Sequence, residues 1–123
     1  MTASTEPSRS DVIVVGSGAA ALSAALAARA GGAGVTIVER TESIGGTTAV
    51  SGGGIWMPQN HLMAQVGSTD SRAEALAYMG RLTAGRTPAD LLEHFVDHGP
   101  DILAGLERTT PLELTAMTWP DYH

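Results

Sequence analysis

The chain has 123 residues, of which seven are basic and 13 acidic, so its formal net charge is −6 at pH 7. This length predicts one domain with a modest core, and the acidic balance argues against nucleic acid or an anionic membrane surface as a partner. Because the sequence contains no Cys, disulfides, thiolate metal sites and Cys nucleophiles are excluded, and we predict a cytoplasmic location.

The opening residues 1–10, MTASTEPSRS, are polar and predict a disordered leader. The first apolar run, Val12 to Val15, is too short for a signal sequence or a membrane span, so we expect no membrane insertion. We therefore expect the ordered part of the chain over residues 11–123.

The first ordered stretch carries the pattern of a β-α-β unit. Val12-Ile13-Val14-Val15 is a continuous run of β-branched residues, which is typical of a parallel strand buried on both faces. The Ala- and Leu-rich stretch from Ala19 to Ala30 predicts a helix, and Gly31-Gly32 predicts its end. Val35 to Val38 then predicts a second strand.

Two further helices are predicted later in the chain. The pair Ser71-x-x-Glu74 has the spacing of a capping box, in which each side chain satisfies a free amide of the first turn. Thr87-Pro88 predicts the second start, with a hydroxyl cap followed by Pro at the first helical position. Gly99-Pro100 predicts the end of this helix, and residues 101–108 predict a separate short one.

The turn after the first strand reads Gly16-x-Gly18-x-x-Ala21, which is a dinucleotide-binding pattern. Gly16 permits a tight turn, Gly18 lets a pyrophosphate approach the backbone, and Ala21 lets helix and strand pack closely. Free amides at the helix start then meet the phosphates. Glu39, 23 positions after Gly16, ends the second strand where an acceptor for a ribose hydroxyl is expected. The alternative is a glycine turn in an ordinary α/β unit.

This pattern leaves open whether the dinucleotide carries nicotinamide or flavin. A nicotinamide-binding unit normally continues through a short loop. Here the sequence continues into Gly45-Gly46-Thr47-Thr48 and Ser51-Gly52-Gly53-Gly54. Such backbone can approach a large cofactor closely and offer amide donors along its length, which favours a flavin. The alternative is a flexible surface loop.

At these residues the sequence resembles the 3-ketosteroid Δ1-dehydrogenases, a flavoprotein family that belongs with the fumarate reductase flavoprotein subunits. The resemblance runs from Asp11 to His123. It rests on the segments VIVVGSGAAALSAALAA, VTIVER, GGTTAVSGGGIWMP, DSRAEALAYM and WPDYH. It implies FAD as the cofactor and an α/β fold, in which a Rossmann-like β-α-β unit is followed by helices. It also implies that the chain is an incomplete N-terminal part of a larger two-domain flavoprotein.

The resemblance assigns cofactor contacts position by position. It implies that Gly16, Ser17, Gly18, Ala19 and Ala20 hold the pyrophosphate, that Glu39 and Arg40 face the adenosine ribose, that Gly46, Thr47 and Thr48 follow the ribityl and pyrophosphate side, and that Ser51, Gly52 and Gly53 lie against the isoalloxazine ring.

In the family that the sequence resembles, a 3-keto steroid loses a proton from C2 and a hydride from C1, and the hydride goes to flavin N5. The resemblance implies that Tyr122 assists the proton-accepting tyrosine. A phenol with a pKa of about 10 is a poor base alone, so it needs a partner or desolvation. The family's enzymes are several times longer, so we expect this chain alone to be inactive. Substrate and an external electron acceptor are then expected to meet regions beyond His123.

Three functions stay open at this stage. The chain is the FAD-binding part of a ketosteroid dehydrogenase, the same part of a fumarate reductase-like enzyme for small unsaturated acids, or a truncated non-catalytic module. An acid substrate needs Arg side chains to clamp it, whereas a steroid needs an apolar cleft. His94 and His98 have the spacing of two metal ligands on one helix face, but no third ligand is evident, so we predict a solvated face and no metal site.

Overall fold

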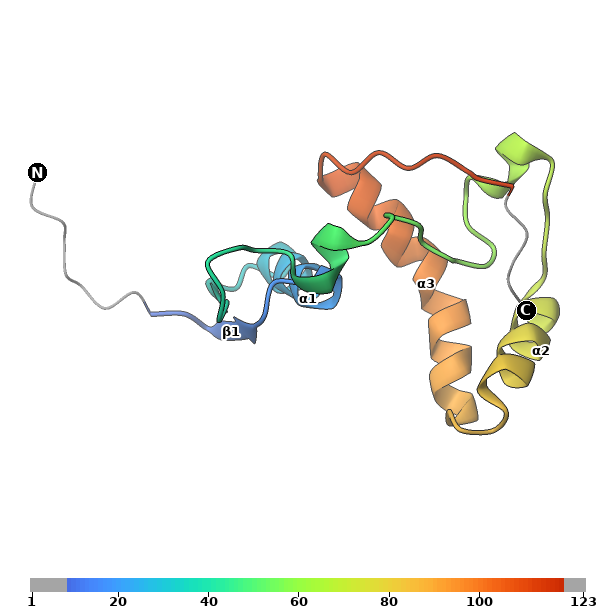
Figure 1. The fold of residues 1–123 in the computed structure, drawn as a ribbon, viewed down its shortest axis with the longest axis horizontal. Coiled ribbons are helices and arrows are strands. Elements are labelled where there is room, and N and C mark those ends of the chain that lie inside the picture. The colour runs from blue at the N-terminus through green and yellow to red at the C-terminus, as the bar shows by residue number, and fades with distance from the viewer. Residues whose placement is uncertain (1–8, 119–123) are drawn as a thin grey trace, which may run out of the picture. The chain divides into compact units, whose positions relative to one another are not determined.

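The computed structural model describes residues 9–118. The chain divides into two compact units, Met1–Gly54 and Ile55–His123 (Figure 1). Both strands of the described residues lie in the first unit, and the regular elements of the second unit are helices. The expectation of a single domain over residues 11–123 stays a prediction.

The first unit is the β-α-β arrangement predicted from the sequence. Strand β1 (Val12–Val15) is followed by helix α1 (Ala19–Ala30) and strand β2 (Val35–Val38). The two strands are parallel, with Val12 paired with Val35 and each following residue in step. Their bounds agree with the predicted ones because apolar runs and glycine stops are local signals. The predicted α/β character is confirmed for this unit.

The core of the first unit lies between α1 and one face of the sheet. Val14 and Ala25 are buried there, at 9% and 6% exposure. Successive strand residues point to opposite faces, so Ile13 and Val15 lie on the other face, where they are 65% and 81% exposed. Within the described residues only α1 packs on this sheet, so one face is open, and cover of that second face stays a prediction.

The second unit is built around two helices that lie side by side, α2 (Arg72–Thr83) and α3 (Ala89–Thr109) (Figure 1). The guanidinium of Arg72 joins them by donating to both carboxylate oxygens of Asp97, at 2.6 and 2.9 Å. This bidentate pairing holds the pKa of the Asp97 carboxyl below its usual value. A short 3-10 helix, η2 (Met63–Val66), precedes α2.

The predicted start of α2 is confirmed. Ser71 is the N-cap, and its hydroxyl accepts from the amide of Glu74 at 3.3 Å. The Glu74 carboxylate in turn accepts from the Ser71 amide at 2.8 Å. Both halves of the capping box are therefore formed.

Helix α3 corrects two predictions. It runs unbroken through Pro100, so the predicted stop at Gly99-Pro100 and the separate helix over residues 101–108 are wrong. Its start also differs, because Pro88 is the N-cap and no side chain caps the helix. Pro100 has no amide proton for the helix, but the helix continues because a buried stripe runs along one face on both sides of it. The stripe consists of Leu92, Val96, Gly99 and Leu103.

Within residues 9–118, every helix is too short or too polar to cross a lipid bilayer.

The capping box generates a stability prediction. Ser71→Ala removes the hydroxyl that satisfies the Glu74 amide, so the first turn of α2 should lose about 1 kcal/mol. Amide hydrogen exchange in α2 measures this loss directly. Ser68→Ala, an exposed serine in the preceding loop, is the matched control. Equal exchange rates in α2 for the two variants would contradict the assignment of the cap.

Candidate functional site

The chain turns sharply between β1 and α1. Gly16 has a φ of 96°, a left-handed conformation that favours glycine, and its amide donates to the carbonyl of Val38 at 2.8 Å. Gly18 is the N-cap of α1. The predicted role of Gly16 in a tight turn is therefore supported by the backbone, and the turn lies beside the end of β2.

The start of α1 presents backbone amides. The Leu22 amide donates to the Gly18 carbonyl at 2.9 Å, so the amides of the three preceding residues lack a partner within the helix. The amide of Ala19 donates to the hydroxyl of Thr48 at 3.1 Å. The helix geometry leaves the amides of Ala20 and Ala21 directed toward the helix start, where a phosphate fits the dipole and the donors.

The carboxylate of Glu39 lies at the end of β2 and accepts four hydrogen bonds. Oε2 accepts from the Ser17 hydroxyl at 2.6 Å. Oε1 accepts from the Arg40 amide at 2.8 Å and from the Thr41 amide at 3.1 Å. The Thr41 hydroxyl lies 3.2 Å from Oε1 and shares its one proton with the carbonyl of Ser43, at 2.7 Å. These donors, the Ser17 hydroxyl above all, lower the pKa of Glu39 from 4.5 to about 2. The site therefore holds a carboxylate that stays charged well below neutral pH.

Ser17 lies inside this arrangement. It is 2% exposed and is the one buried polar side chain among the described residues. Its hydroxyl donates to Glu39 and accepts from the amide of Gly45 at 2.8 Å. One side chain thus joins the turn after β1, the end of β2 and the start of the glycine-rich stretch.

The glycine-rich stretch is partly regular. A 3-10 helix, η1 (Gly46–Val50), occupies its middle, and Gly45 precedes it with a φ of 107°. A Cβ on Gly45 would lie 2.5 Å from the Cβ of Ala49, so any larger residue here is both strained and obstructed. The residues after η1 are open, with nothing within 4 Å of a Cβ placed on Gly52, Gly53 or Gly54.

Most of the residues that the sequence assigned to a cofactor lie at this one end of the β-α-β unit. The turn, the start of α1, the end of β2 and η1 bring together Gly16, Ser17, Gly18, Ala19, Ala20, Glu39, Gly46 and Thr48. Arg40, Thr47, Ser51, Gly52 and Gly53 belong to the same unit and are exposed. Contacts of these residues with a cofactor stay a prediction. Tyr122 lies outside the described residues.

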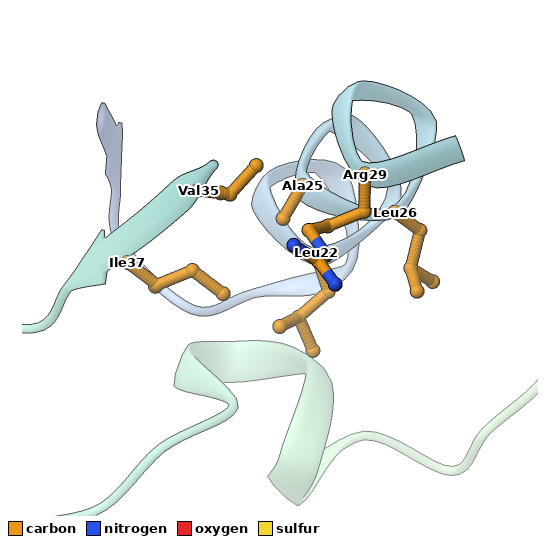
Figure 2. Close-up of a pocket in the computed structure, with 6 residues that line it drawn as sticks. All are labelled: Leu22, Ala25, Leu26, Arg29, Val35 and Ile37. Carbon is orange, nitrogen blue, oxygen red and sulfur yellow. The ribbon is translucent and has the colours of Figure 1, made fainter. Parts of the chain in front are cut away.

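A separate apolar groove of about 300 Å³ lies between α1 and β2. Figure 2 shows Leu22 and Ala25 of the helix beside Val35 and Ile37 of the strand. The groove is lined by Leu22, Ala25, Leu26, Arg29, Val35 and Ile37, none of which the sequence assigned to the cofactor. Its walls are almost wholly apolar, so it offers packing surface and few groups for orienting a polar ligand.

The second unit brings together polar side chains that sequence reasoning either weighed or missed. His94 and His98 are exposed on α3 with ring centroids 4.4 Å apart, and no cluster of three metal-ligating side chains occurs in residues 9–118. His61 donates to Glu107 at 2.5 Å, and the same carboxylate accepts from the Leu114 amide at 3.0 Å. The contact between His61 and Glu107 spans 46 positions, so no local pattern could have revealed it.

Comparison with known proteins agrees with this geometry. The sequence matches the family described as FAD binding domain over residues 11–121. FAD, the cofactor predicted from the sequence, is therefore confirmed at the level of the family. The turn, the α1 amides and the Glu39 carboxylate fit such a dinucleotide, because they supply donors for phosphate and an acceptor for ribose at one end of the sheet.

Two curated relatives and one solved structure extend the comparison. The chain is 39% identical over 114 residues to a 3-oxosteroid 1-dehydrogenase of Mycolicibacterium smegmatis, which covers 92% of this chain and 20% of the relative. It is 40% identical over 113 residues to a 4-oxocyclohex-2-ene-1-carboxylate 5-dehydrogenase of Sinomonas cyclohexanicum, covering 91% of this chain and 19% of that protein.

The solved structure is that of a 3-ketosteroid Δ1-dehydrogenase from Sterolibacterium denitrificans in complex with 1,4-androstadiene-3,17-dione. It matches with a TM-score of 0.75 and 40% identity, over 80% of this chain and 17% of that one. The resemblance to this family that the sequence predicted is confirmed. The chain spans about a fifth of the length of the curated relatives it matches.

The low pKa of Glu39 predicts how acid affects the fold. The folded-state pKa of about 2 lies below the ordinary 4.5, so the stabilisation is present above pH 4.5 and is lost as the pH falls through 2. Between those pH values, the wild-type chain should lose more stability than Glu39→Gln, which does not titrate. Urea unfolding at a series of pH values measures the difference.

Glu42→Gln, in the exposed loop that follows, is the control for removing one negative charge. It should keep the wild-type acid profile. A ¹³C titration of the Glu39 carboxyl gives an independent reading, and a midpoint near its ordinary value would contradict the hydrogen-bonded geometry.

Proposed function

Because the chain belongs to the FAD binding domain family, we propose that it forms the FAD-binding portion of an oxidoreductase that dehydrogenates 3-ketosteroids between C1 and C2. The observation that carries the cofactor part of this proposal is the hydrogen bond between Ser17 and Glu39, at 2.6 Å. It sets a charged ribose acceptor beside the glycine turn and the open amides of α1, which is the arrangement a dinucleotide requires.

The chain's own residues have distinct binding tasks in this proposal. The amides at the start of α1 bind the pyrophosphate, and Glu39 accepts from the adenosine ribose. Gly46, Thr47 and Thr48 follow the ribityl side. Ser51 with Gly52 and Gly53 lies against the isoalloxazine ring, where the lack of Cβ atoms on the glycines allows close approach. Arg40 flanks the ribose with Glu39.

The reaction assigned to the whole enzyme rests on its relatives. FAD, when bound, supplies the acceptor for a hydride. Tyr122 assists removal of the proton beside the ketone, by helping a second tyrosine act as base. The names of the two relatives reported above both describe a substrate with a ketone in its ring, which favours a cyclic ketone as the substrate. A cytoplasmic location and an external electron acceptor complete the proposal, as inferred from the sequence.

Gly18 provides the first test. Gly18→Val places a branched side chain at the helix start, where the pyrophosphate approaches. A Cβ atom at this position fits within the protein, since the nearest atom, Thr48 Oγ1, is 3.7 Å away. We therefore expect the substitution to weaken flavin binding. The host is a chimera in which residues 11–121 replace the matching part of the M. smegmatis relative.

After purification, the Gly18→Val chimera should hold at most about a tenth of the flavin per protein that the unmodified chimera holds, as measured by absorbance. Ala24→Val adds the same side chain to an exposed position of α1 and serves as the control. Stoichiometric flavin in the Gly18→Val chimera would overturn the assignment of the pyrophosphate site.

The second test concerns the 123-residue chain by itself. Catalysis needs a hydride acceptor, a proton acceptor and a group that polarises the carbonyl, all held in one dry cleft. The chain offers residues for FAD and, toward the second task, only Tyr122. It should therefore bind flavin weakly or not at all and show no turnover of a 3-keto steroid with an artificial electron acceptor. Turnover that disappears in Tyr122→Phe would contradict this expectation.

A further inference from the structure

The Ser17 side chain has no surface left for a ligand. It is 2% exposed, and its single hydroxyl proton is committed to Glu39 Oε2 at 2.6 Å. The Ser17 hydroxyl oxygen also accepts a hydrogen bond from the amide of Gly45 at 2.8 Å. A phosphate could accept from this hydroxyl only by breaking a buried hydrogen bond, which is costly, and a ribose hydroxyl could donate to it only by displacing the atoms that bury it. The side chain therefore acts on its protein neighbours.

The two oxygens of Glu39 are used unequally. Oε1 accepts from the amides of Arg40 and Thr41, and the Thr41 hydroxyl shares its one proton between Oε1, at 3.2 Å, and the carbonyl of Ser43, at 2.7 Å. Oε2 accepts one within the described residues, from Ser17. A carboxylate oxygen has two lone pairs, so Oε2 has capacity for one more donor. The Ser17 hydrogen bond fixes the direction in which that free lone pair points.

We propose that Ser17 is a positioning residue, whose buried hydroxyl aims Glu39 Oε2 at the adenosine 2′-hydroxyl and ties Gly45 to the same point. This inference rests on the proposed FAD site and changes one part of it, because the Ser17 side chain supports the cofactor through Glu39 without touching it. The backbone of Ser17 still belongs to the turn at the pyrophosphate.

A structural role alone makes a different prediction. If Ser17 served only to fill the core and hold Gly45, its loss would weaken binding of every flavin nucleotide equally. If Ser17 orients Glu39, its loss should weaken binding only of a ligand that carries the adenosine 2′-hydroxyl. The test therefore couples a protein change to a ligand change.

The experiment compares FAD with 2′-deoxy-FAD as ligands of the apo chimera defined above. In the unmodified chimera, loss of the 2′-hydroxyl should weaken binding about tenfold, the scale of a hydrogen bond to a charged group. In Ser17→Ala and in Glu39→Gln this ratio should fall toward one, and the double variant should fall no further. Ser23→Ala, another serine of the same unit, should keep the tenfold ratio.

A second measurement needs no flavin and uses the 123-residue chain. A ¹³C titration should show the Glu39 midpoint of Ser17→Ala moving up from about 2 toward 4.5, while Ser23→Ala leaves it in place. Ser17→Cys, of similar size but with a weaker donor, should fall between wild type and alanine. The carboxyl titration does not depend on flavin, so it still tests Ser17 if the proposed function fails.

The outcomes distinguish failure of the proposed FAD-binding function from failure of the positioning role of Ser17. If the unmodified chimera binds no FAD, the proposed function is wrong and the titration alone decides on Ser17. If Ser17→Ala weakens FAD and 2′-deoxy-FAD equally, or leaves the Glu39 midpoint unchanged, the positioning role is wrong. Additive losses from Ser17→Ala and Glu39→Gln would likewise overturn it.

Discussion

The order of the candidate site depends on one buried hydrogen-bonded group, the hydroxyl of Ser17. It bonds to Glu39 on one side and to the amide of Gly45 on the other. A second hydroxyl, that of Thr48, accepts from the Ala19 amide and attaches the glycine-rich stretch to α1. With these two attachments, a segment that makes few apolar contacts is held against the turn. The binding surface is therefore organised by polar contacts, while the core of the same unit is apolar and lies elsewhere.

The sequence predicted the parts of the fold that local patterns encode. The bounds of β1, α1 and β2 followed from apolar runs and glycine stops, and the capping box at Ser71 followed from spacing. The glycine turn and Glu39 were proposed as dinucleotide contacts from their separation along the chain, whereas the other cofactor contacts were implied by the family resemblance. These signals require no knowledge of which distant residues meet.

Where the prediction failed, tertiary contacts decided the outcome. A glycine and a proline in succession indicate a helix end, yet α3 continues because Val96 and Leu103 on either side are buried on one face. The role of the Ser17 side chain was also beyond sequence reasoning, since its partners lie 22 and 28 positions away.

The pairing register of the sheet also bears on how the chain acquires its structure. Val12 must meet Val35 before either strand gains a partner, and the intervening helix has to form within the loop being closed. By contrast, α2 ends at Thr83 and α3 begins at Ala89, so the two helices can start to pair across a short connection, although Arg72 and Asp97 themselves lie 25 positions apart. Closing the loop between Val12 and Val35 costs more than closing this connection, so the helical pair should assemble first. The element that carries the nucleotide fingerprint, although synthesised earlier, is then the later one to mature.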